Sequence, residues 1–360
     1  MSIEGSYKKL AAANLARTEQ YVRNIKRLFE KAKSRLVELS SGVDYDPSGG
    51  QFYFADYPEL TKAVEKAVNG LALGMQRVIV NATTAEWAMG TKDADGVVEY
   101  LLKIAGLKPG DAISAIVIGQ RLNNHDAALK AFQSRAIGGL PLSRRVWNLA
   151  ESQKIEAELA RSIAEGTSAD ELARSMQQWL KEPSKLFRRV RDEFGILQLS
   201  KNAKAYNPGQ GEGGGVYRSS YKNAMRLART EINMAYRSAE LEAWGDMHQV
   251  VGVEIRRSAN PYPCPLCQAL AGRYPKKINW KGWHPHCRCY MVPILVTDDE
   301  FFDMLDDEDF DPTTSVNYVG DVPDGFKGWV EDNKKRAKGW SSLPYFIKDN
   351  MDYVVASATI

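Results

Sequence analysis

The sequence predicts a mainly α-helical protein in three parts: a helical N-terminal region, a small α+β domain built on a cluster of cysteine and histidine residues, and an acidic C-terminal tail. Three observations lead to this fold class. Apolar residues recur at helical spacing over much of the first two hundred residues, every cysteine lies between Cys264 and Cys289, and acidic residues gather after residue 297.

Length and composition set the outer limits. At 360 residues the chain exceeds the usual size of one domain and can bury a sizeable core. With 44% hydrophobic and 26% charged residues it has the composition of a soluble globular protein, so we expect no membrane span. The first residues, Met1-Ser-Ile-Glu-Gly-Ser-Tyr-Lys-Lys, contain no apolar stretch, so we expect no export signal. Because the cysteines share one cluster, we expect a reducing setting.

The net charge of +3 divides unevenly along the chain. Residues 217–289 hold twelve Lys/Arg against five Asp/Glu, a net of +7, whereas residues 290–360 hold six against fifteen, a net of −9. This layout indicates two surfaces with different partners, or an acidic block that folds onto a basic one.

Residues 1–140 form the predicted helical N-terminal region. A helix is expected over 17–40 and a second from about Pro58 toward Trp87, with shorter helices near 96–106 and 121–135. The apolar stripe of the first helix is Val22, Ile25, Phe29, Ala32, Leu36 and Leu39.

Residues 141–206 predict a helical hairpin. Ser143 can cap a first helix that ends at Gly166, and Ser168 with Glu171 forms a capping box for a second that Pro183 ends. The glycine-rich stretch 207–216 lacks the Gly-Lys-Ser/Thr of a phosphate-binding loop, so we interpret it as a linker.

Residues 217–297 predict the α+β domain. A helix over about 217–244 has a small-residue face made of Tyr221, Met225, Ala228, Ile232, Ala235 and Ala239. Beside this face runs a basic stripe of Arg218, Lys222, Arg226, Arg229 and Arg237, which suits either a phosphate backbone or a solvated surface. Alternation of Val251, Val253 and Ile255 predicts a strand over 249–256.

The cysteine and histidine residues that follow have the spacing of a zinc site. Cys264 and Cys267 form a Cys-x2-Cys pair, and His284-Pro-His286-Cys287-Arg-Cys289 closes the motif about twenty residues later. A redox Cys-x-x-Cys pair is less favoured because no strand leads into a helix there, and structural disulfides are less favoured without an export signal. Zinc ligation by Cys264, Cys267 and Cys287 is expected, with His284 or Cys289 as the fourth ligand.

The motifs of zinc hydrolases and zinc deaminases include a carboxylate that activates a zinc-bound water. This motif contains no such carboxylate. We therefore expect a closed, structural zinc site that stabilises a loop with few apolar residues of its own. Trp280 and Trp283 are expected to pack over it.

Residues 298–360 form the acidic and aromatic C-terminal tail. Within it, residues 298–311 interleave carboxylates with Phe301, Phe302 and Phe310. Such a segment is either disordered or a docking segment that binds a partner or folds back on the basic domain, and we favour docking or folding back.

Several pieces follow one another in a distinctive order over about 140–297: Leu142-Ser143-Arg-Arg-Val146-Trp147, then Arg229-Thr230-Glu231 within a helix, a short strand, Cys264-Pro-Leu-Cys267-Gln-Ala-Leu-Ala-Gly272 and His284-Pro-His286-Cys287-Arg-Cys289. On these residues the chain resembles the phage Mu F-like minor head (head morphogenesis) proteins of tailed bacteriophages.

That resemblance implies a non-enzymatic structural protein of the virion. It would lie inside the head or at the portal vertex, assemble in the host cytoplasm, contact the portal or the major capsid protein, and assist head assembly and packaging or ejection of DNA. Two alternatives remain open: a metal-assisted nuclease that uses His284 and His286, and a non-catalytic DNA-binding protein that uses Arg218, Lys222, Arg226 and Arg229.

Overall fold

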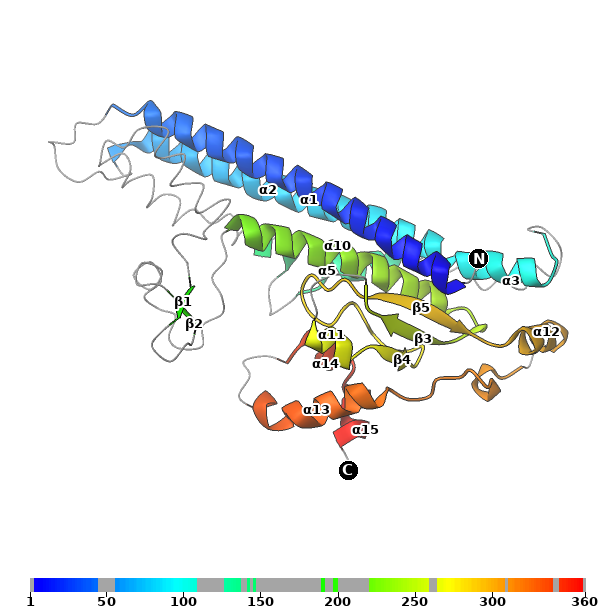
Figure 1. The fold of residues 1–360 in the computed structure, drawn as a ribbon. Coiled ribbons are helices and arrows are strands. Elements are labelled where there is room, and N and C mark those ends of the chain that lie inside the picture. The colour runs from blue at the N-terminus through cyan, green and yellow to red at the C-terminus, as the bar shows by residue number, and fades with distance from the viewer. Residues whose placement is uncertain are drawn as a thin grey trace. The chain divides into compact units, whose positions relative to one another are not determined.

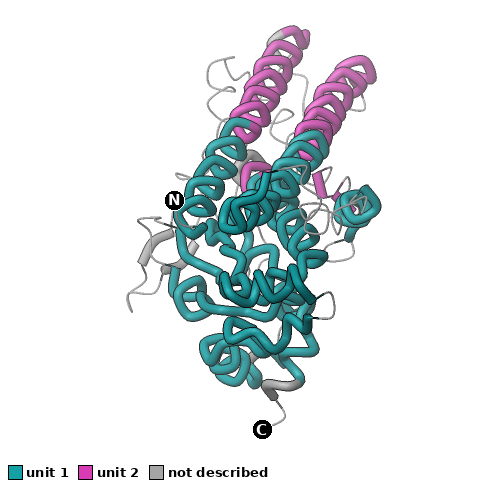
Figure 2. The backbone as a smooth tube through the Cα atoms, turned by 90° about the vertical axis from the view of Figure 1, so that its right-hand side faces the viewer, with its two compact units in different colours: residues 1–20, 80–138, 229–360 teal, residues 21–79, 139–228 magenta. Residues whose placement is uncertain are grey.

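The fold was analysed in a computed structural model of the chain. The structure describes residues 3–44, 56–108, 126–136, 141–142, 145–146, 189–191, 197–199, 220–258, 264–307, 310–338 and 343–358. Two compact units emerge (Figure 2): unit 1 comprises Met1–Gln20, Val80–Gly138 and Arg229–Ile360, and unit 2 comprises Tyr21–Ile79 and Gly139–Ala228. The predicted fold class is confirmed, since the protein is mainly helical with an α+β region toward its C-terminus.

Two long helices dominate the N-terminal region (Figure 1): α1 (Ile3–Ser41) and α2 (Pro58–Ala94). Both extend beyond the predicted limits of 17–40 and Trp87. Within unit 2 the predicted stripe of α1 is buried at Val22, Ile25, Phe29, Ala32 and Leu36, and α2 buries Val64, Val68, Leu71, Met75 and Ile79. The helices approach closely at Gly74, where an added Cβ would lie 3.1 Å from the Leu28 side chain.

Unit 2 also contains a short antiparallel pair, β1 (Arg189–Arg191) and β2 (Leu197–Leu199), in which Val190 faces Gln198. The sequence predicted only helix in this region, because three-residue strands are too short to show alternation. Of the helical hairpin predicted over 141–206, Leu142 and Val146 are helical and buried. Its caps and the glycine-rich stretch 207–216 lie outside the described residues.

The sheet of unit 1 has three antiparallel strands in the order β4-β3-β5. The central strand β3 (Val250–Arg256) pairs with β4 (Gly272–Tyr274) on one side and β5 (Tyr290–Leu295) on the other. The prediction of a strand here is confirmed. Val250, Val251, Val253 and Ile255 are all buried, because side chains from both faces of the strand are covered.

Helix α10 (Ser220–Gly245) directly precedes the sheet along the chain (Figure 1). Its predicted small-residue face is buried at Met225, Ala228, Ile232, Ala235 and Ala239. Within unit 1 it packs so closely on α2 that a Cβ on Gly90 would collide with the carbonyl oxygen of Tyr236. Two shorter helices, α3 (Gly96–Ile104) and α5 (Asp126–Ser134), lie where helices were predicted.

The acidic C-terminal region contributes directly to the core of unit 1. After α11 (Pro265–Ala269) and the sheet come α12 (Asp298–Asp306), a 3-10 turn η3 (Pro312–Thr314), α13 (Asp324–Ala337), α14 (Tyr345–Lys348) and α15 (Met351–Ala358). Phe301, Phe326 and Phe346 are buried in the same cluster as the sheet residues.

The acidic segment 298–311 therefore contains a capped helix with one buried aromatic residue. Thr297 and Glu300 form a complete capping box at the start of α12, and Phe302 stays 44% exposed. Across the described residues, every helix is too short or too polar to cross a membrane.

Candidate metal centre

The first pair of candidate ligands lies at the start of helix α11. Cys264 is the N-cap residue, Pro265 follows in the first turn, and Cys267 lies one turn on, with the backbone N–H of Gln268 donating to the carbonyl of Cys264 at 3.0 Å. A proline in the first turn loses no helical hydrogen bond, so the Cys-Pro-Leu-Cys sequence forms a short, regular turn. This turn directs both sulfur atoms to one side.

The second group lies on a tight turn before β5. The backbone N–H of Cys287 donates to the carbonyl of His284 at 3.0 Å, so Pro285 and His286 occupy the two central turn positions. Proline suits the first of these, and the second has a positive φ of 61° at His286. The turn brings His284 and Cys287 together at its two ends.

The two groups meet in one cluster of thiols and imidazole. The Nε2 atom of His284 lies 3.4 Å from Sγ of Cys264 and 3.2 Å from Sγ of Cys267, and the sulfurs of Cys267 and Cys287 are 3.8 Å apart. Two sets of donor atoms, Cys264–Cys267–His284 and Cys267–Cys287–Cys289, each lie within 4.8 Å of one another. Cys267 belongs to both sets, so all five residues predicted as ligands are brought to one place.

These separations fit a tetrahedral metal ion. With metal–sulfur bonds of about 2.3 Å and metal–nitrogen bonds of about 2.0 Å, two ligand atoms lie about 3.8 Å apart for two sulfurs and about 3.5 Å apart for sulfur and nitrogen. The observed sulfur–sulfur distance of 3.8 Å and sulfur–nitrogen distances of 3.2 and 3.4 Å match these values. Cys287 shares a set of donor atoms with Cys267 but not with Cys264 and His284, so an ion bound by these four residues requires the Cys287 side chain to move toward the other two ligands.

The histidine has the tautomer that ligation requires. Nδ1 of His284 lies 2.9 Å from the carbonyl oxygen of Pro285, which can only accept a hydrogen bond. Nδ1 therefore carries the proton, and the lone pair of Nε2 faces the thiols. A fixed outer hydrogen bond of this kind orients metal-binding histidines in general.

Three of the four thiols are buried and lie close to one another. Cys267, Cys287 and Cys289 are buried. Hydrogen bonds from the thiols of Cys267 and Cys289 hold the pKa of Cys287 well below its usual value, and the positive charge of Arg237 acts in the same direction. A bound cation would displace the thiol protons, because thiolate is the form that binds metal.

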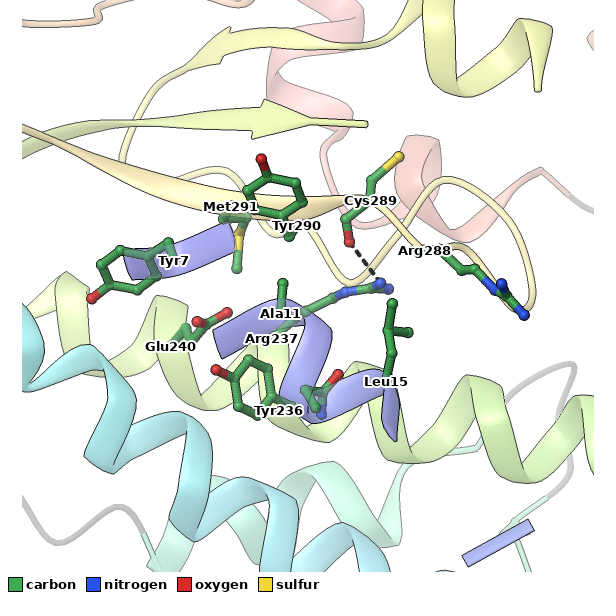
Figure 3. Close-up of a pocket in the computed structure, with 11 residues that line it drawn as sticks. Tyr7, Ala11, Leu15, Tyr236, Arg237, Glu240, Arg288, Cys289, Tyr290 and Met291 are labelled. Carbon is green, nitrogen blue, oxygen red and sulfur yellow. Dashed lines mark hydrogen bonds between the residues drawn. The ribbon is translucent and has the colours of Figure 1, made fainter. Parts of the chain in front are cut away.

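Arg237 of helix α10 holds the ligand loop from inside. One guanidinium nitrogen donates to the carbonyl of Lys281 at 3.0 Å, and the other donates to the carbonyls of Cys287 at 2.7 Å and Cys289 at 2.8 Å (Figure 3 shows the contact with Cys289). The guanidinium also lies 4.9 Å from the ring centre of Trp280. This one buried side chain satisfies three backbone carbonyls that flank the candidate ligands.

Gly282 makes the close approach of Arg237 possible. Its φ of 124° is unfavourable for other residues, and an added Cβ would lie 2.8 Å from the guanidinium and 3.1 Å from the Cβ of Cys287. Trp280 and Trp283 are fully buried beside it, in the cluster that includes Cys267, Cys287 and Cys289. Their predicted packing over the site itself stays a prediction.

Three consecutive residues of α10 connect the centre to the rest of unit 1. Arg229 forms a two-pronged ion pair with Glu19 of α1, with both N–O distances at 2.7 Å. Thr230 accepts a hydrogen bond at 3.0 Å from the backbone N–H of His286 in the ligand turn, and Glu231 pairs with Arg135 at 2.7 Å. The Arg-Thr-Glu sequence thus fixes α1, the ligand turn and the end of α5 against one helix.

Among the predicted DNA-binding residues, Arg229 is engaged in this ion pair. Arg226 is exposed on α10, Arg218 lies outside the described residues, and the side chain of Lys222 is likewise not described. The basic stripe stays a prediction.

His286 belongs to neither set of donor atoms, and burial, with Arg229 adding to it, lowers its pKa to about 4.

A small cavity lies on the other side of Arg237, between α1, α10 and β5. Tyr7, Tyr236, Glu240 and Met291 line it (Figure 3), and its volume is ≈ 10 Å³. This volume corresponds to about one water molecule, so the cavity is too small for an organic substrate. Burial, with Asp93 adding to it, raises the pKa of Glu240 well above its usual value.

A scan against protein-family models and searches of curated proteins and of solved structures each found no match to this chain.

Proposed function

We propose that the cluster binds one zinc ion as a structural site, with Cys264, Cys267, Cys287 and His284 as ligands. Three thiolates and one imidazole are soft and borderline donors, a combination that selects zinc over magnesium or calcium. His284 is preferred to Cys289 as the fourth ligand because its Nε2 lies within 3.4 Å of two sulfurs and its Nδ1 is already held by Pro285.

A closed site is favoured by the surroundings of the ligands. Arg237 immobilises the backbone on both sides of the ligand turn, and two tryptophans pack beside the buried thiols. Such a site stabilises the fold instead of presenting an open coordination position to a substrate. The observation that carries this proposal is the gathering of the four side chains in one place, with three of their separations equal to those around a tetrahedral ion.

We infer further that the protein is a minor head protein of a tailed phage, which acts structurally at the portal vertex or on the inner surface of the head. Support comes from the resemblance of the Arg-Thr-Glu helix and the Cys/His motif to that family. In unit 1 these same segments are joined, since Thr230 hydrogen-bonds the ligand turn. A rigid centre of this kind suits a protein whose role is to present surfaces to portal, capsid or DNA.

Mass spectrometry of purified virions of the encoding phage tests this function. We expect the chain in the particles at a few copies for each portal ring, and retained after nuclease and high-salt washing. Particles that contain the portal protein but lack this chain would contradict the proposal.

The nuclease alternative is tested separately with plasmid DNA and Mg²⁺ or Mn²⁺. Metal-dependent cleavage by the wild-type chain that His286→Ala abolishes would replace the structural function with an enzymatic one. A salt-dependent affinity for DNA that falls when Arg226 and Lys222 are neutralised would add DNA binding to it.

A further inference from the structure

The C-terminal segment closes over the ligand loop. Asn350, which is buried, accepts a hydrogen bond from the backbone N–H of Asn279 at 2.8 Å and donates to the carbonyl of the same residue at 3.0 Å. Lys281 pairs with Asp349 at 3.1 Å, and Phe346 packs edge-on against Trp283 with ring centres 5.4 Å apart. Helix α14 is therefore held on residues 279–283, directly before the first histidine of the motif.

This arrangement brings the hydroxyl group of Tyr345 to the thiol cluster. A Cβ atom added to Gly282 would lie 3.6 Å from the hydroxyl oxygen of Tyr345. The same Cβ would lie 3.1 Å from Cβ of Cys287 and 2.8 Å from Nη1 of Arg237. The three groups thus surround one small space that Gly282 leaves open.

The Tyr345 hydroxyl is buried and has no hydrogen-bond partner within the described part of the chain. A buried hydroxyl without a partner costs about 1–3 kcal/mol, so an acceptor is expected nearby. Arg237 cannot serve, because a guanidinium has no acceptor atom. The sulfur of Cys287 can accept a hydrogen bond, and the Cβ of this residue borders the same space as the hydroxyl.

We propose that Tyr345 donates a hydrogen bond to the metal-bound thiolate of Cys287, so that the C-terminal helix α14 forms part of the metal centre. This inference rests on the proposed metal site. Tyr345 acts as a positioning residue: it fixes the thiolate in the tetrahedral geometry and lowers its negative charge density. Residues 345–350 and the metal then stabilise the same loop from opposite sides.

The test uses the full-length chain loaded with Co²⁺, whose thiolate charge-transfer bands report on the ligand sulfurs. In Tyr345→Phe the sulfur loses a hydrogen bond and becomes a better electron donor, so these bands should move to longer wavelength. Zinc affinity, measured by competition with a chromogenic chelator, should fall about 10-fold, the lower end for loss of an outer hydrogen bond. Tyr318→Phe, which removes the same atom from an exposed ring, should change neither quantity.

A second variant protects the test against a failure of Tyr345→Phe to fold. Asn350→Ala removes the contacts with Asn279 and should move the same bands in the same direction by a smaller amount. Bands and zinc affinity that match the wild type in either folded variant would overturn the role of Tyr345 and leave the metal site standing. A wild-type chain that binds neither Co²⁺ nor Zn²⁺ would instead overturn the metal site itself.

Discussion

Replacing Arg237 with methionine tests whether the ligand loop depends on a contact from α10. The change keeps a long apolar side chain but removes the donors to the carbonyls of Lys281, Cys287 and Cys289. A hydrogen bond from a charged group contributes about 1.5 kcal/mol or more, so the loss of three donors should cost about 4 kcal/mol. Each carbonyl that stays buried without a donor adds a cost of about 1–3 kcal/mol of the same kind.

Thermal unfolding of the metal-loaded protein measures this cost. For a folding unit of about 200 residues, 1 kcal/mol shifts Tm by about 2–4 °C, so Arg237→Met should lower Tm by about 10 °C. The matched control is Arg273→Met on strand β4, an exposed position where the change should stay within about 0.5 kcal/mol. Arg237→Lys should recover only part of the loss, because an ammonium group lacks the planar fork that reaches three carbonyls.

A Tm for Arg237→Met within about 1 °C of the wild type would refute the reasoning, since no reading of the hydrogen-bond energies allows so small a change. Equal losses in Arg237→Met and Arg273→Met would also refute it, because the effect would then follow from the loss of positive charge alone.

Three further predictions concern packing, pH and ligand choice. Gly90→Ala should lower the free energy of unfolding by about 1–3 kcal/mol in urea titrations because its methyl group meets the backbone of α10, whereas Gly70→Ala, in open space on the same helix, should raise it by about 0.5–1 kcal/mol. The hydrogen bond from the backbone N–H of the N-cap residue, with others from the turn after η3, lowers the pKa of Glu300 to about 2. The ionised Glu300 therefore stabilises the folded protein above pH 4.5, and this stabilisation is lost as the pH falls toward 2. The difference in Tm between wild type and Glu300→Gln should therefore shrink over that range, and a constant difference would contradict the capping role. His284→Ala should lose the metal while Cys289→Ser keeps it, as metal analysis after dialysis can show; the reverse result would make Cys289 the fourth ligand.

Local patterns in the sequence were sufficient for the long helices, the central strand and the candidate ligands. Val22, Ile25 and Phe29 recur at helical spacing, and the alternation around Val253 identifies β3, since each pattern records which face the element buries. The cysteines were found through chemistry, because thiolate and imidazole at this spacing have few other uses.

Contacts between distant segments could not be predicted in the same way. Arg237 fell on a stripe of basic residues, and only the fold shows that it points to carbonyls about fifty positions later. The buried position of Arg237 had only an indirect sign in the sequence, because Glu240 lies one helical turn away beside an apolar face. Arg237 and Glu240 are both buried. The composition of the acidic segment likewise concealed Phe301, which one helical turn places in the core.

The metal content of the purified full-length chain tests the central claim most directly. Elemental analysis after exhaustive dialysis should find about one equivalent of zinc per chain, and Cys267→Ser should abolish it because this sulfur belongs to both sets of donor atoms. Less than about half an equivalent in the wild type, or full retention in Cys267→Ser, would contradict the account.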